Sequence, residues 1–321
     1  MSLPKPLRLA IKALSKPNID LEKTYRIVRR VTRAAHHPRL TPLYKPWDHI
    51  IWRDGHKVPV RVFTPDNDRR TGKLLLFFHG GGWVTGDIDC YSDICVRMSN
   101  MTGHKVVSVD YSLAPEHRFP AGLEDCYCAM QEILQNAAVF GTVPGRVALI
   151  GDSAGGNLAA ACSLLARDRG GLRVGQQILL YPSTYNDHDP RTSPFDSVRE
   201  NGQDNLLTVR LVKDYIALYE SSGADRCNPY FAPLIAGDLS CQPDTLIITA
   251  ELDPLRDEGE AYGRRLAAAG AYVQVHRMPD ALHGFLSLPG LPPPVKRAYG
   301  WINAFLYRTE YAARAVSSGG A

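Results

Sequence analysis

Hydrophobic and polar positions alternate in two different ways along the chain. Up to residue 45 the apolar residues recur at helical spacing, first over Leu7–Leu14 and again over Leu21–Val31. From residue 46 onward, short apolar runs rich in β-branched side chains take over. The first two runs, "HIIWRD" and "VPVRVFTP", flank the dipeptide Asp54-Gly55. A turn dipeptide between two such runs predicts an antiparallel hairpin.

Six further apolar runs predict buried strands. They read "KLLLFFHG", "KVVSVDY", "RVALIGD", "QILLYP", "TLIITAE" and "YVQVHRMP", and helical stretches separate most of them. Continuous apolar strands that alternate with helices are typical of a mostly parallel sheet covered on both faces. With the hairpin, this pattern predicts an α/β protein with a central, mostly parallel, eight-stranded sheet flanked by helices.

One interval interrupts this rhythm. Residues 183–243 are long and polar, and they contain a helical piece, "TVRLVKDYIALYE". Insertions of this length usually serve a function, so we expect a lid or a wall of a binding site here.

Composition and charge exclude several classes of protein. The chain is 45% apolar and 22% charged with a net charge of +4, and no block of Lys and Arg concentrates that charge. A nucleic-acid-binding protein would need a basic stripe or a recognition motif, so we expect no nucleic-acid partner. No apolar run approaches the roughly 20 residues that span a bilayer, and no secretory signal is recognisable. We therefore expect a cytoplasmic protein without stable membrane insertion, although its basic, amphipathic N-terminal segment leaves contact with a membrane surface as an alternative.

The seven cysteines are irregularly spaced, and no C-x-x-C motif occurs among them. This argues against a zinc ribbon and against a thioredoxin-like redox site. We expect free thiols, with a Cys227–Cys241 disulfide as the open alternative. The adjacent pair His36 and His37 has no acidic or thiol partner nearby in the sequence. The sequence therefore implies no metal and no organic cofactor.

A serine stands at the junction between a predicted strand and a predicted helix. In "VALIGDSAGGNLAA", Gly151 and Gly155 bracket Ser153 in a G-x-S-x-G pattern. This motif is the nucleophile elbow of α/β hydrolases, a strained turn that lifts the serine hydroxyl clear of the sheet. A glycine-rich turn with a helix-capping serine is the plainer interpretation.

A serine hydroxyl needs a base to act as a nucleophile. In this fold the acid and the histidine follow the serine in that order. Asp253 follows the run "TLIITAE" and His283 follows "YVQVHRMP", so both lie where predicted strands end. We expect Ser153, Asp253 and His283 to form a catalytic triad. The other acids nearby are Asp257 and Glu258, which fit the first turn of the next helix, and Asp280, which fits a turn, while His276 fits a structural place within the last strand.

A glycine-rich loop follows the run "KLLLFF". Its sequence is His79-Gly-Gly-Gly-Trp83, and no G-K-[ST] follows that would indicate a phosphate-binding loop. Consecutive glycines let backbone N–H groups approach a developing alkoxide closely. We assign Gly81 and Gly82 as oxyanion donors, with the Ala154 N–H as the third.

Together these motifs resemble the hormone-sensitive lipase family of α/β-hydrolase esterases. The matching pieces are "HGGGW", "DYSLAPEHRFPA", "GDSAGGNLA", "DPLRDEG" and "HGF", in the family's order and across most of residues 46–306. The resemblance implies the same triad, the same oxyanion hole and a helical cap. The implied organisation is a set of N-terminal cap helices at 1–45, a catalytic domain at 46–182 and 226–310, and a cap insertion at 183–225. The tail, 311–321, is expected to be disordered.

The predicted activity is that of a serine carboxylesterase acting on small-molecule esters with short to medium acyl chains. Five residues are expected to line the pocket: Trp83, Val212, Tyr215, Ile216 and Phe285. Two alternatives are deacetylation of an acetyl ester or arylacetamide, and a non-catalytic small-molecule receptor on the same scaffold. The sequence leaves the oligomeric state open, with a homodimer as one alternative.

Overall fold

The computed structural model describes residues 20–35, 47–53, 55–66, 72–203 and 205–308. Within these ranges, eight strands form one sheet in the order β1-β2-β4-β3-β5-β6-β7-β8. The pairs β1–β2 and β2–β4 are antiparallel, and every other neighbouring pair is parallel. The predicted mostly parallel, eight-stranded sheet is therefore confirmed.

The boundaries of the elements follow the apolar runs. The strands are β1 (Trp47–Arg53), β2 (His56–Phe63), β3 (Leu74–Phe78), β4 (Lys105–Val109), β5 (Val147–Asp152), β6 (Gln176–Leu180), β7 (Asp244–Leu252) and β8 (Val273–Leu282). The α-helices are α2 (Leu21–Ala35), α3 (Ile88–Thr102), α4 (Ala121–Gln135), α5 (Ala154–Arg169), α6 (Asp196–Asn201), α7 (Val209–Tyr219), α8 (Arg256–Ala268) and α9 (Pro293–Leu306). Short 3-10 helices are η1 (Ala137–Phe140), η2 (Pro144–Arg146), η3 (Gly223–Cys227), η4 (Pro233–Ile235) and η5 (Phe285–Ser287). The helix expected over Leu7–Leu14 and the tail at 311–321 lie outside the described residues.

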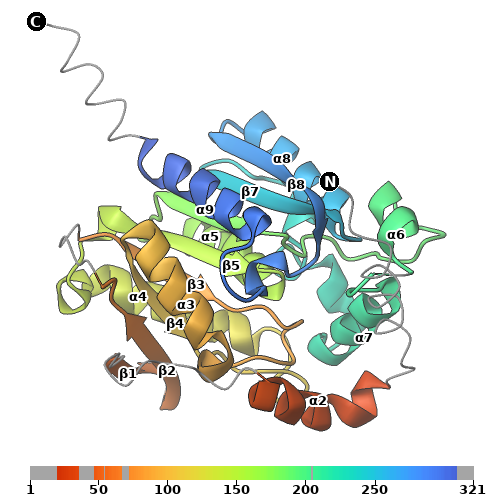
Figure 1. Ribbon diagram of the computed structural model, residues 1–321, viewed down its shortest axis with the longest axis horizontal. Coiled ribbons are helices and arrows are strands. Elements are labelled where there is room, and N and C mark those ends of the chain that lie inside the picture. Colours follow the sequence, from red (N-terminus) through yellow and green to blue (C-terminus); the bar gives the residue numbers. More distant parts are fainter. Residues whose placement is uncertain (1–19, 36–46, 54, 67–71, 204, 309–321) are drawn as a thin grey trace, which may run out of the picture.

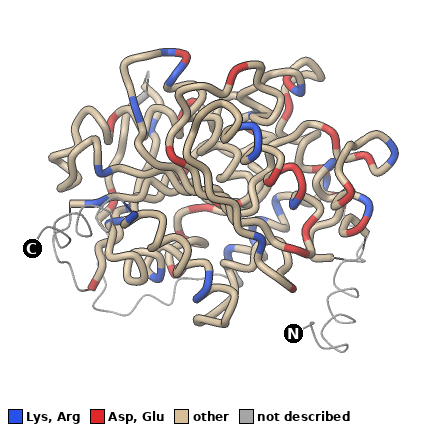
Figure 2. The backbone as a smooth tube through the Cα atoms, turned by 90° about the horizontal axis from the view of Figure 1, so that it is seen from above, with Lys and Arg blue, Asp and Glu red and all other residues tan. Residues whose placement is uncertain are grey.

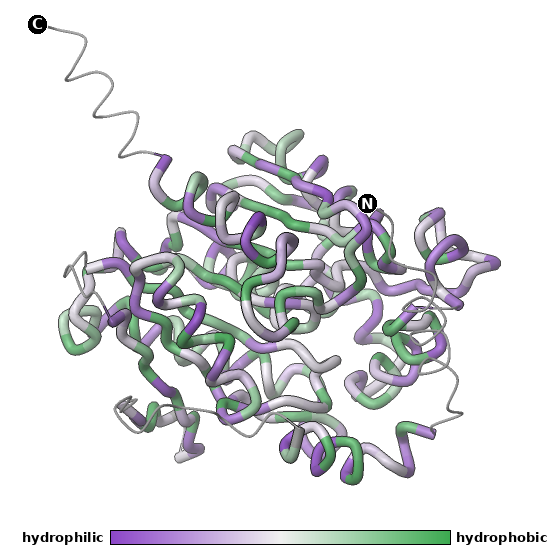
Figure 3. The backbone as a smooth tube through the Cα atoms, viewed as in Figure 1, coloured by the Kyte–Doolittle hydropathy of each residue, from purple (hydrophilic) through white to green (hydrophobic). Residues whose placement is uncertain are grey.

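The central strands are apolar on both sides because both faces of the sheet are covered. In β3 all five residues are buried, and successive side chains alternate between two separate core clusters. Leu74 and Leu76 belong to one cluster, while Leu75 and Phe77 belong to the other. Side chains along a strand point to opposite faces in turn, so an uninterrupted apolar run is what a doubly covered strand requires. Figure 3 shows this hydrophobic interior along the strands.

Two layers of helices sandwich the sheet (Figure 1). Helices α3 and α9 supply buried side chains to one core cluster, and α4, α5 and α8 supply the other. Helix α5 is buried from Ala154 through Ala166. A helix with apolar or small residues on all sides is suited to such a place, because every face meets protein rather than water.

Three further helices, α2, α6 and α7, lie together beyond one end of the sheet (Figure 1). Helix α2 packs against α7, although the two are far apart in the sequence. Thr208 caps α7 by accepting a hydrogen bond from the Leu211 N–H at 3.2 Å. These helices stand at the end of the sheet where the parallel strands terminate, the edge at which α/β proteins assemble their binding sites.

A single turn between β4 and α4 holds both α2 and α7. The Glu116 carboxylate accepts hydrogen bonds from the Arg29 guanidinium of α2 at 3.0 and 2.9 Å. The Arg118 guanidinium donates to the carbonyls of Ala217 and Glu220, at the C-terminal end of α7, at 3.1 and 2.6 Å. A cation at that end of a helix also interacts favourably with the helix dipole.

The surface carries acidic and basic residues interspersed, as Figure 2 shows. All seven cysteines are free thiols, so Cys227 and Cys241 are not joined. Across the described residues, no helix has both the length and the apolar character needed to cross a membrane.

Candidate active site

Ser153 occupies a sharp turn between β5 and α5. Its backbone has φ 56° and ψ −117°, a conformation that side-chain-bearing residues rarely adopt and that marks local strain. The flanking glycines leave no room for a side chain. A Cβ on Gly151 would lie 2.1 Å from the Gly155 carbonyl oxygen, and a Cβ on Gly155 would lie 1.9 Å from the Phe78 carbonyl oxygen. The glycines of the motif are therefore required by the close approach of strand, turn and helix.

The structure brings Ser153, His283 and Asp253 into one hydrogen-bonded chain. His283 Nε2 lies 2.8 Å from Ser153 Oγ, and His283 Nδ1 lies 2.7 Å from Asp253 Oδ2. The Asp253 side chain is fully buried, and the His283 side chain is 12% exposed. A carboxylate beside Nδ1 keeps the proton on that nitrogen, so Nε2 is the acceptor that faces the serine hydroxyl.

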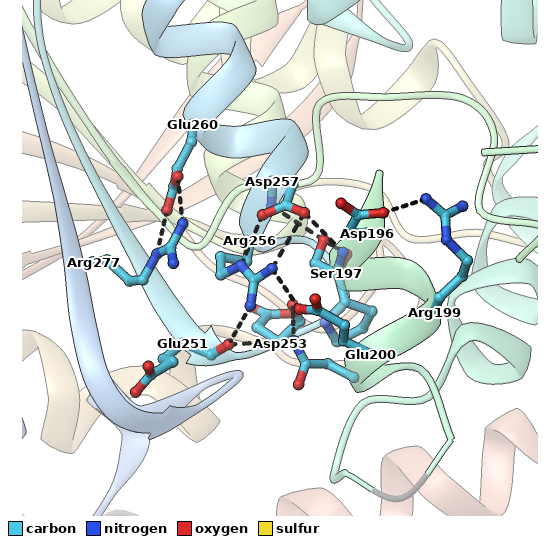
Figure 4. Close-up of polar contacts among 12 residues, drawn as sticks. Asp196, Ser197, Arg199, Glu200, Glu251, Asp253, Arg256, Asp257, Glu260 and Arg277 are labelled. Atoms are coloured by element: carbon cyan, nitrogen blue, oxygen red, sulfur yellow. Dashed lines mark hydrogen bonds and ion pairs between the residues drawn. The ribbon is translucent and has the colours of Figure 1, made fainter. Parts of the chain in front are cut away.

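Asp253 is held from both sides of its carboxylate and from the neighbouring backbone. Its other oxygen accepts the Leu255 N–H at 2.9 Å. Figure 4 shows how α6 supports the same turn. Ser197 donates its hydroxyl to the Pro254 carbonyl at 2.8 Å, and its own N–H donates to the Asp257 carboxylate at 2.8 Å. The loop that carries Asp253 is thus fastened to the inserted segment.

The alternative acids have other partners. Asp257 accepts from Arg256 at 2.7 Å in the first turn of α8. Glu258, expected only to start that helix, is completely buried and does more. It accepts the Thr184 N–H at 2.6 Å and lies 2.6 Å from His188 Nε2, which fixes the start of the inserted segment.

Two further residues of the last strand are also accounted for. Asp280, expected in a turn, instead belongs to β8, where the pairing with β7 is irregular and its φ is +56°. The strand takes a turn-like conformation at Asp280 without ending, which explains why the sequence there indicated a turn. His276 stacks on Trp301 with ring centroids 4.6 Å apart, as a structural residue does.

The glycine loop has three consecutive residues with positive φ: Gly81 at 109°, Gly82 at 62° and Trp83 at 60°. The Gly81 carbonyl accepts the Thr85 N–H at 2.9 Å, which closes the loop. Gly81, Gly82 and Ala154, the predicted oxyanion donors, line the same cavity as Ser153 and His283. The arrangement can therefore surround a reacting carbonyl with a hydroxyl, an imidazole and main-chain amides.

His79 lies beneath this loop and is a structural residue. Its Nδ1 is 2.8 Å from the Gly80 carbonyl oxygen, and its ring stacks on Tyr111 with centroids 4.3 Å apart. Burial lowers the pKa of His79 to about 4, so the ring stays neutral and donates to that carbonyl.

Asp152 anchors the start of the loop from the other side. Its carboxylate accepts the Gly80 N–H at 2.8 Å and the Tyr91 hydroxyl at 3.3 Å. Burial raises the pKa of Asp152 to about 6 and outweighs the hydrogen bonds from Gly80 and Tyr91, which favour the charged form. Tyr91 also lines the cavity, and no motif in the sequence singles it out.

The cavity over Ser153 has a volume of about 200 Å³ and a mostly apolar lining. Of the expected pocket residues, Trp83, Val212 and Tyr215 line it. Ile216 and Phe285 do not. Ile216 is 2% exposed and points into the core cluster shared with α4 and α5. Phe285 follows Gly284, whose φ of 75° turns the chain away, and packs against the Tyr181 ring in the opposite cluster.

Several further residues that line the cavity were not predicted from the sequence. They are Tyr91, Ser183, Leu206, Leu207, Leu211, Leu255 and Ser287. The adjacent leucines at 206 and 207 follow the polar stretch "SVRENGQDN", and Leu211 lies one helical turn before Tyr215; these are the signals that could have found the three leucines. The others carry no local signal, because their place depends on how distant segments meet.

The sheet order, the strand–turn–helix serine and its helical surroundings define an α/β hydrolase. Comparison with known proteins agrees: the family profile described as "alpha/beta hydrolase fold" matches residues 75–287. An arylesterase of Saccharolobus solfataricus is 38% identical over 249 residues, which cover 77% of this chain and 79% of the relative. Carboxylesterase NlhH of Mycobacterium tuberculosis is 36% identical over 280 residues, or 86% of each chain.

Solved structures extend this likeness to the whole architecture. The hyperthermophilic esterase from the archaeon Pyrobaculum calidifontis superimposes with a TM-score of 0.85 at 34% identity, covering 97% of this chain and 99% of the other. The chain belongs to the hormone-sensitive lipase family of α/β-hydrolase carboxylesterases. It is an enzyme, a carboxylic ester hydrolase, and its substrates are small-molecule esters.

Proposed function

We propose that the protein hydrolyses esters with short to medium acyl chains through a Ser153–His283–Asp253 triad and an acyl-enzyme intermediate. The observation that carries the proposal is the position of His283. Its ring lies within hydrogen-bond distance of both Ser153 Oγ and Asp253 Oδ2, at 2.8 and 2.7 Å, at the wall of an apolar cavity.

In the first half of the reaction, Ser153 Oγ attacks the ester carbonyl carbon while its proton passes to His283 Nε2. The carbonyl oxygen becomes an alkoxide, and the N–H groups of Gly81, Gly82 and Ala154 donate to it. Each such donor contributes about 3 kcal/mol of transition-state stabilisation. The tetrahedral intermediate then collapses, and His283 gives its proton to the departing alcohol.

The second half repeats these steps with water. His283 Nε2 takes a proton from water as the water oxygen attacks the acyl carbon, and it gives that proton to Ser153 Oγ as the second tetrahedral intermediate collapses. The products are the carboxylic acid and the regenerated enzyme. Asp253 accepts the hydrogen bond from His283 Nδ1 and stabilises the imidazolium that forms twice in each cycle.

The size of the cavity supports a small acyl group. A volume of about 200 Å³ lies below the range of about 300–1,000 Å³ that is usual for pockets holding drug-sized ligands. Leu206, Leu207, Leu211 and Leu255 make the lining apolar. We therefore favour acyl groups from acetyl to about hexanoyl over emulsified triglyceride, and the similarity to an arylesterase supports aryl esters as assay substrates.

We further propose that residues 1–45 and the insertion at 183–225 form a cap over a catalytic domain made of 46–182 and 226–310. The packing of α2 against α7 and the attachment of α6 beside Asp253 support this division. In that arrangement the insertion supplies the roof of the pocket, and the catalytic domain supplies its floor.

The test is hydrolysis of p-nitrophenyl butyrate by wild type and by Ser153→Ala. We expect the variant to lose nearly all activity while its far-UV circular dichroism is preserved. Ser240→Ala, on the loop before β7, is the matched control and should keep wild-type turnover. A fluorophosphonate should label wild type at Ser153, located by peptide mass mapping. Wild-type turnover in Ser153→Ala would refute the proposal.

A further inference from the structure

Helix α7 packs directly onto the glycine loop. The ring of Tyr215 lies so close to Gly82 that a Cβ added there would be 2.3 Å from the ring's Cγ and 2.4 Å from Cδ1. Gly82 therefore lacks a side chain because the tyrosine of another segment occupies that space. Tyr215 also lines the cavity over Ser153, so the contact is at the site itself.

A second contact of α7 follows one helical turn later. Tyr219 stacks on Trp83 with ring centroids 4.4 Å apart and an interplanar angle of 1°. Residues four apart on a helix share a face, so Tyr215 and Tyr219 together cover two consecutive loop positions, Gly82 and Trp83. Trp83 has a φ of 60°, which an L-residue with a bulky side chain adopts only when its surroundings impose it.

Thr85, at the other end of the loop, is a close polar neighbour of the Tyr215 hydroxyl. The Thr85 hydroxyl donates to the Gly81 carbonyl at 3.0 Å. Tyr215 therefore packs on Gly82 through its ring and lies next to the residue that closes the loop onto Gly81.

Helix α7 is itself fixed to the body of the protein next to these contacts. The Phe119 N–H donates to the Tyr219 carbonyl at 2.8 Å. Arg118 binds the carbonyls of Ala217 and Glu220, as described above. Because these bonds lie within about one turn of Tyr215, the helix presents its aromatic face at a fixed position.

We propose that Tyr215 is a positioning residue: by packing its ring on Gly82, next to the Thr85 that closes the loop onto Gly81, it holds the glycine loop in the conformation that aims its amides at the oxyanion. This inference rests on the proposed function. Gly81 and Gly82 adopt a positive φ without steric cost, but Trp83 does so only where its surroundings impose it, so the loop depends on an external support. Preorganised donors contribute to the rate only while their geometry is maintained, so the loss of the support lowers kcat.

A tyrosine that only formed part of the pocket wall would behave differently. Its removal would change the binding of substrate and of transition state alike, which appears in KM. A residue that maintains the oxyanion hole acts mainly in the transition state, so its removal lowers kcat and leaves KM nearly constant. The division of the effect between kcat and KM therefore separates the two roles.

The experiment compares Tyr215→Leu, Tyr215→Phe and Leu211→Ala with p-nitrophenyl butyrate. Leu211 also lines the cavity from α7 and is the control for loss of wall contact. We expect Tyr215→Leu to lower kcat by roughly tenfold or more with KM within about threefold of wild type. Tyr215→Phe keeps the ring on Gly82 and should recover most of that loss. Leu211→Ala should act mainly on KM.

A transition-state analogue provides a second readout. An alkyl trifluoromethyl ketone forms a tetrahedral adduct with the serine, and its oxygen occupies the oxyanion hole. We expect its affinity to fall in Tyr215→Leu by about the same factor as kcat. If that variant does not fold, Thr85→Val, at a buried residue outside the cavity lining, removes the hydroxyl that donates to the Gly81 carbonyl, and kcat should again fall at nearly constant KM.

Full kcat in a folded Tyr215→Leu, full kcat in a folded Thr85→Val, or an effect confined to KM would overturn the positioning role. These outcomes all require an active wild type. Failure of the proposed function would instead appear as a wild type that neither hydrolyses the ester nor reacts with a fluorophosphonate at Ser153.

Discussion

Replacement of Asp152 by asparagine should stabilise the protein at neutral pH and not at low pH. The carboxyl is buried, and burial raises its pKa from 3.8 to about 6. An acid whose pKa is raised by folding binds its proton more tightly in the folded state. Its favourable contribution is therefore complete below pH ~3.8 and is lost as the pH rises through ~6. An asparagine amide at this position would keep an oxygen for the Gly80 N–H and would not ionise.

The size of the effect follows from the shift. A rise from 3.8 to about 6 corresponds to about 3 kcal/mol in total, at about 1.4 kcal/mol per pH unit. Part of this is already lost at pH 4.5, so the change between pH 4.5 and 7.5 is about 2 kcal/mol. We expect the free energy of unfolding of Asp152→Asn, relative to wild type, to increase by that amount over this range.

The assay is urea unfolding followed by circular dichroism at half-unit steps of pH. Asp238→Asn is the control, because Asp238 is exposed and hydrogen bonds from Ser240 lower its pKa. The sign of its pH dependence is opposite, since a lowered pKa stabilises the folded state above the unfolded value. A difference between Asp152→Asn and wild type that stays flat from pH 4.5 to 7.5 would show that the buried carboxylate carries no such cost.

Two other substitutions test the support of the site. Gly151→Ala puts a Cβ 2.1 Å from the Gly155 carbonyl oxygen, so the elbow must open. We expect the free energy of unfolding, measured by urea titration, to fall by about 1–3 kcal/mol. Initial rates should show a large loss of ester hydrolysis in the same variant. Glu258→Ala removes a fully buried side chain that accepts the Thr184 N–H and contacts His188. It should lower the free energy of unfolding by about 1–3 kcal/mol because the Thr184 N–H loses its partner, and an unchanged free energy of unfolding would contradict this role.

Much of the fold could be predicted because its signals are local. A strand covered on both faces is buried along its length and reads as an uninterrupted apolar run. The sequences of β3 and β5 show such runs. The sequence signal for the elbow is local as well. Gly151 and Gly155 are required because residues nearby in the chain or on the adjacent strand occupy the space that a side chain would need. Asp253 and His283 could be chosen because strand ends gather at one edge of a parallel sheet.

The pocket lining could not be predicted to the same depth, because it depends on how the inserted helices rotate over the body. Val212 and Tyr215 face the cavity, while Ile216, on the same helix, turns into the core. Phe285 follows a histidine of the site but leaves it through the positive φ of Gly284. Tyr91 reaches the cavity from a helix on the far side of the glycine loop, and only the tertiary arrangement reveals this.

The turn between β4 and α4 has a consequence for engineering. Glu116 pairs with a side chain of α2, Arg29, so an exchange of that helix alone can leave the carboxylate without its cation. Arg118 instead binds main-chain carbonyls at the end of α7, which any helix in that place would supply. A chimera with the selectivity of a relative should therefore take α2 and the proline-rich bend from one parent, whereas α7 can be exchanged separately.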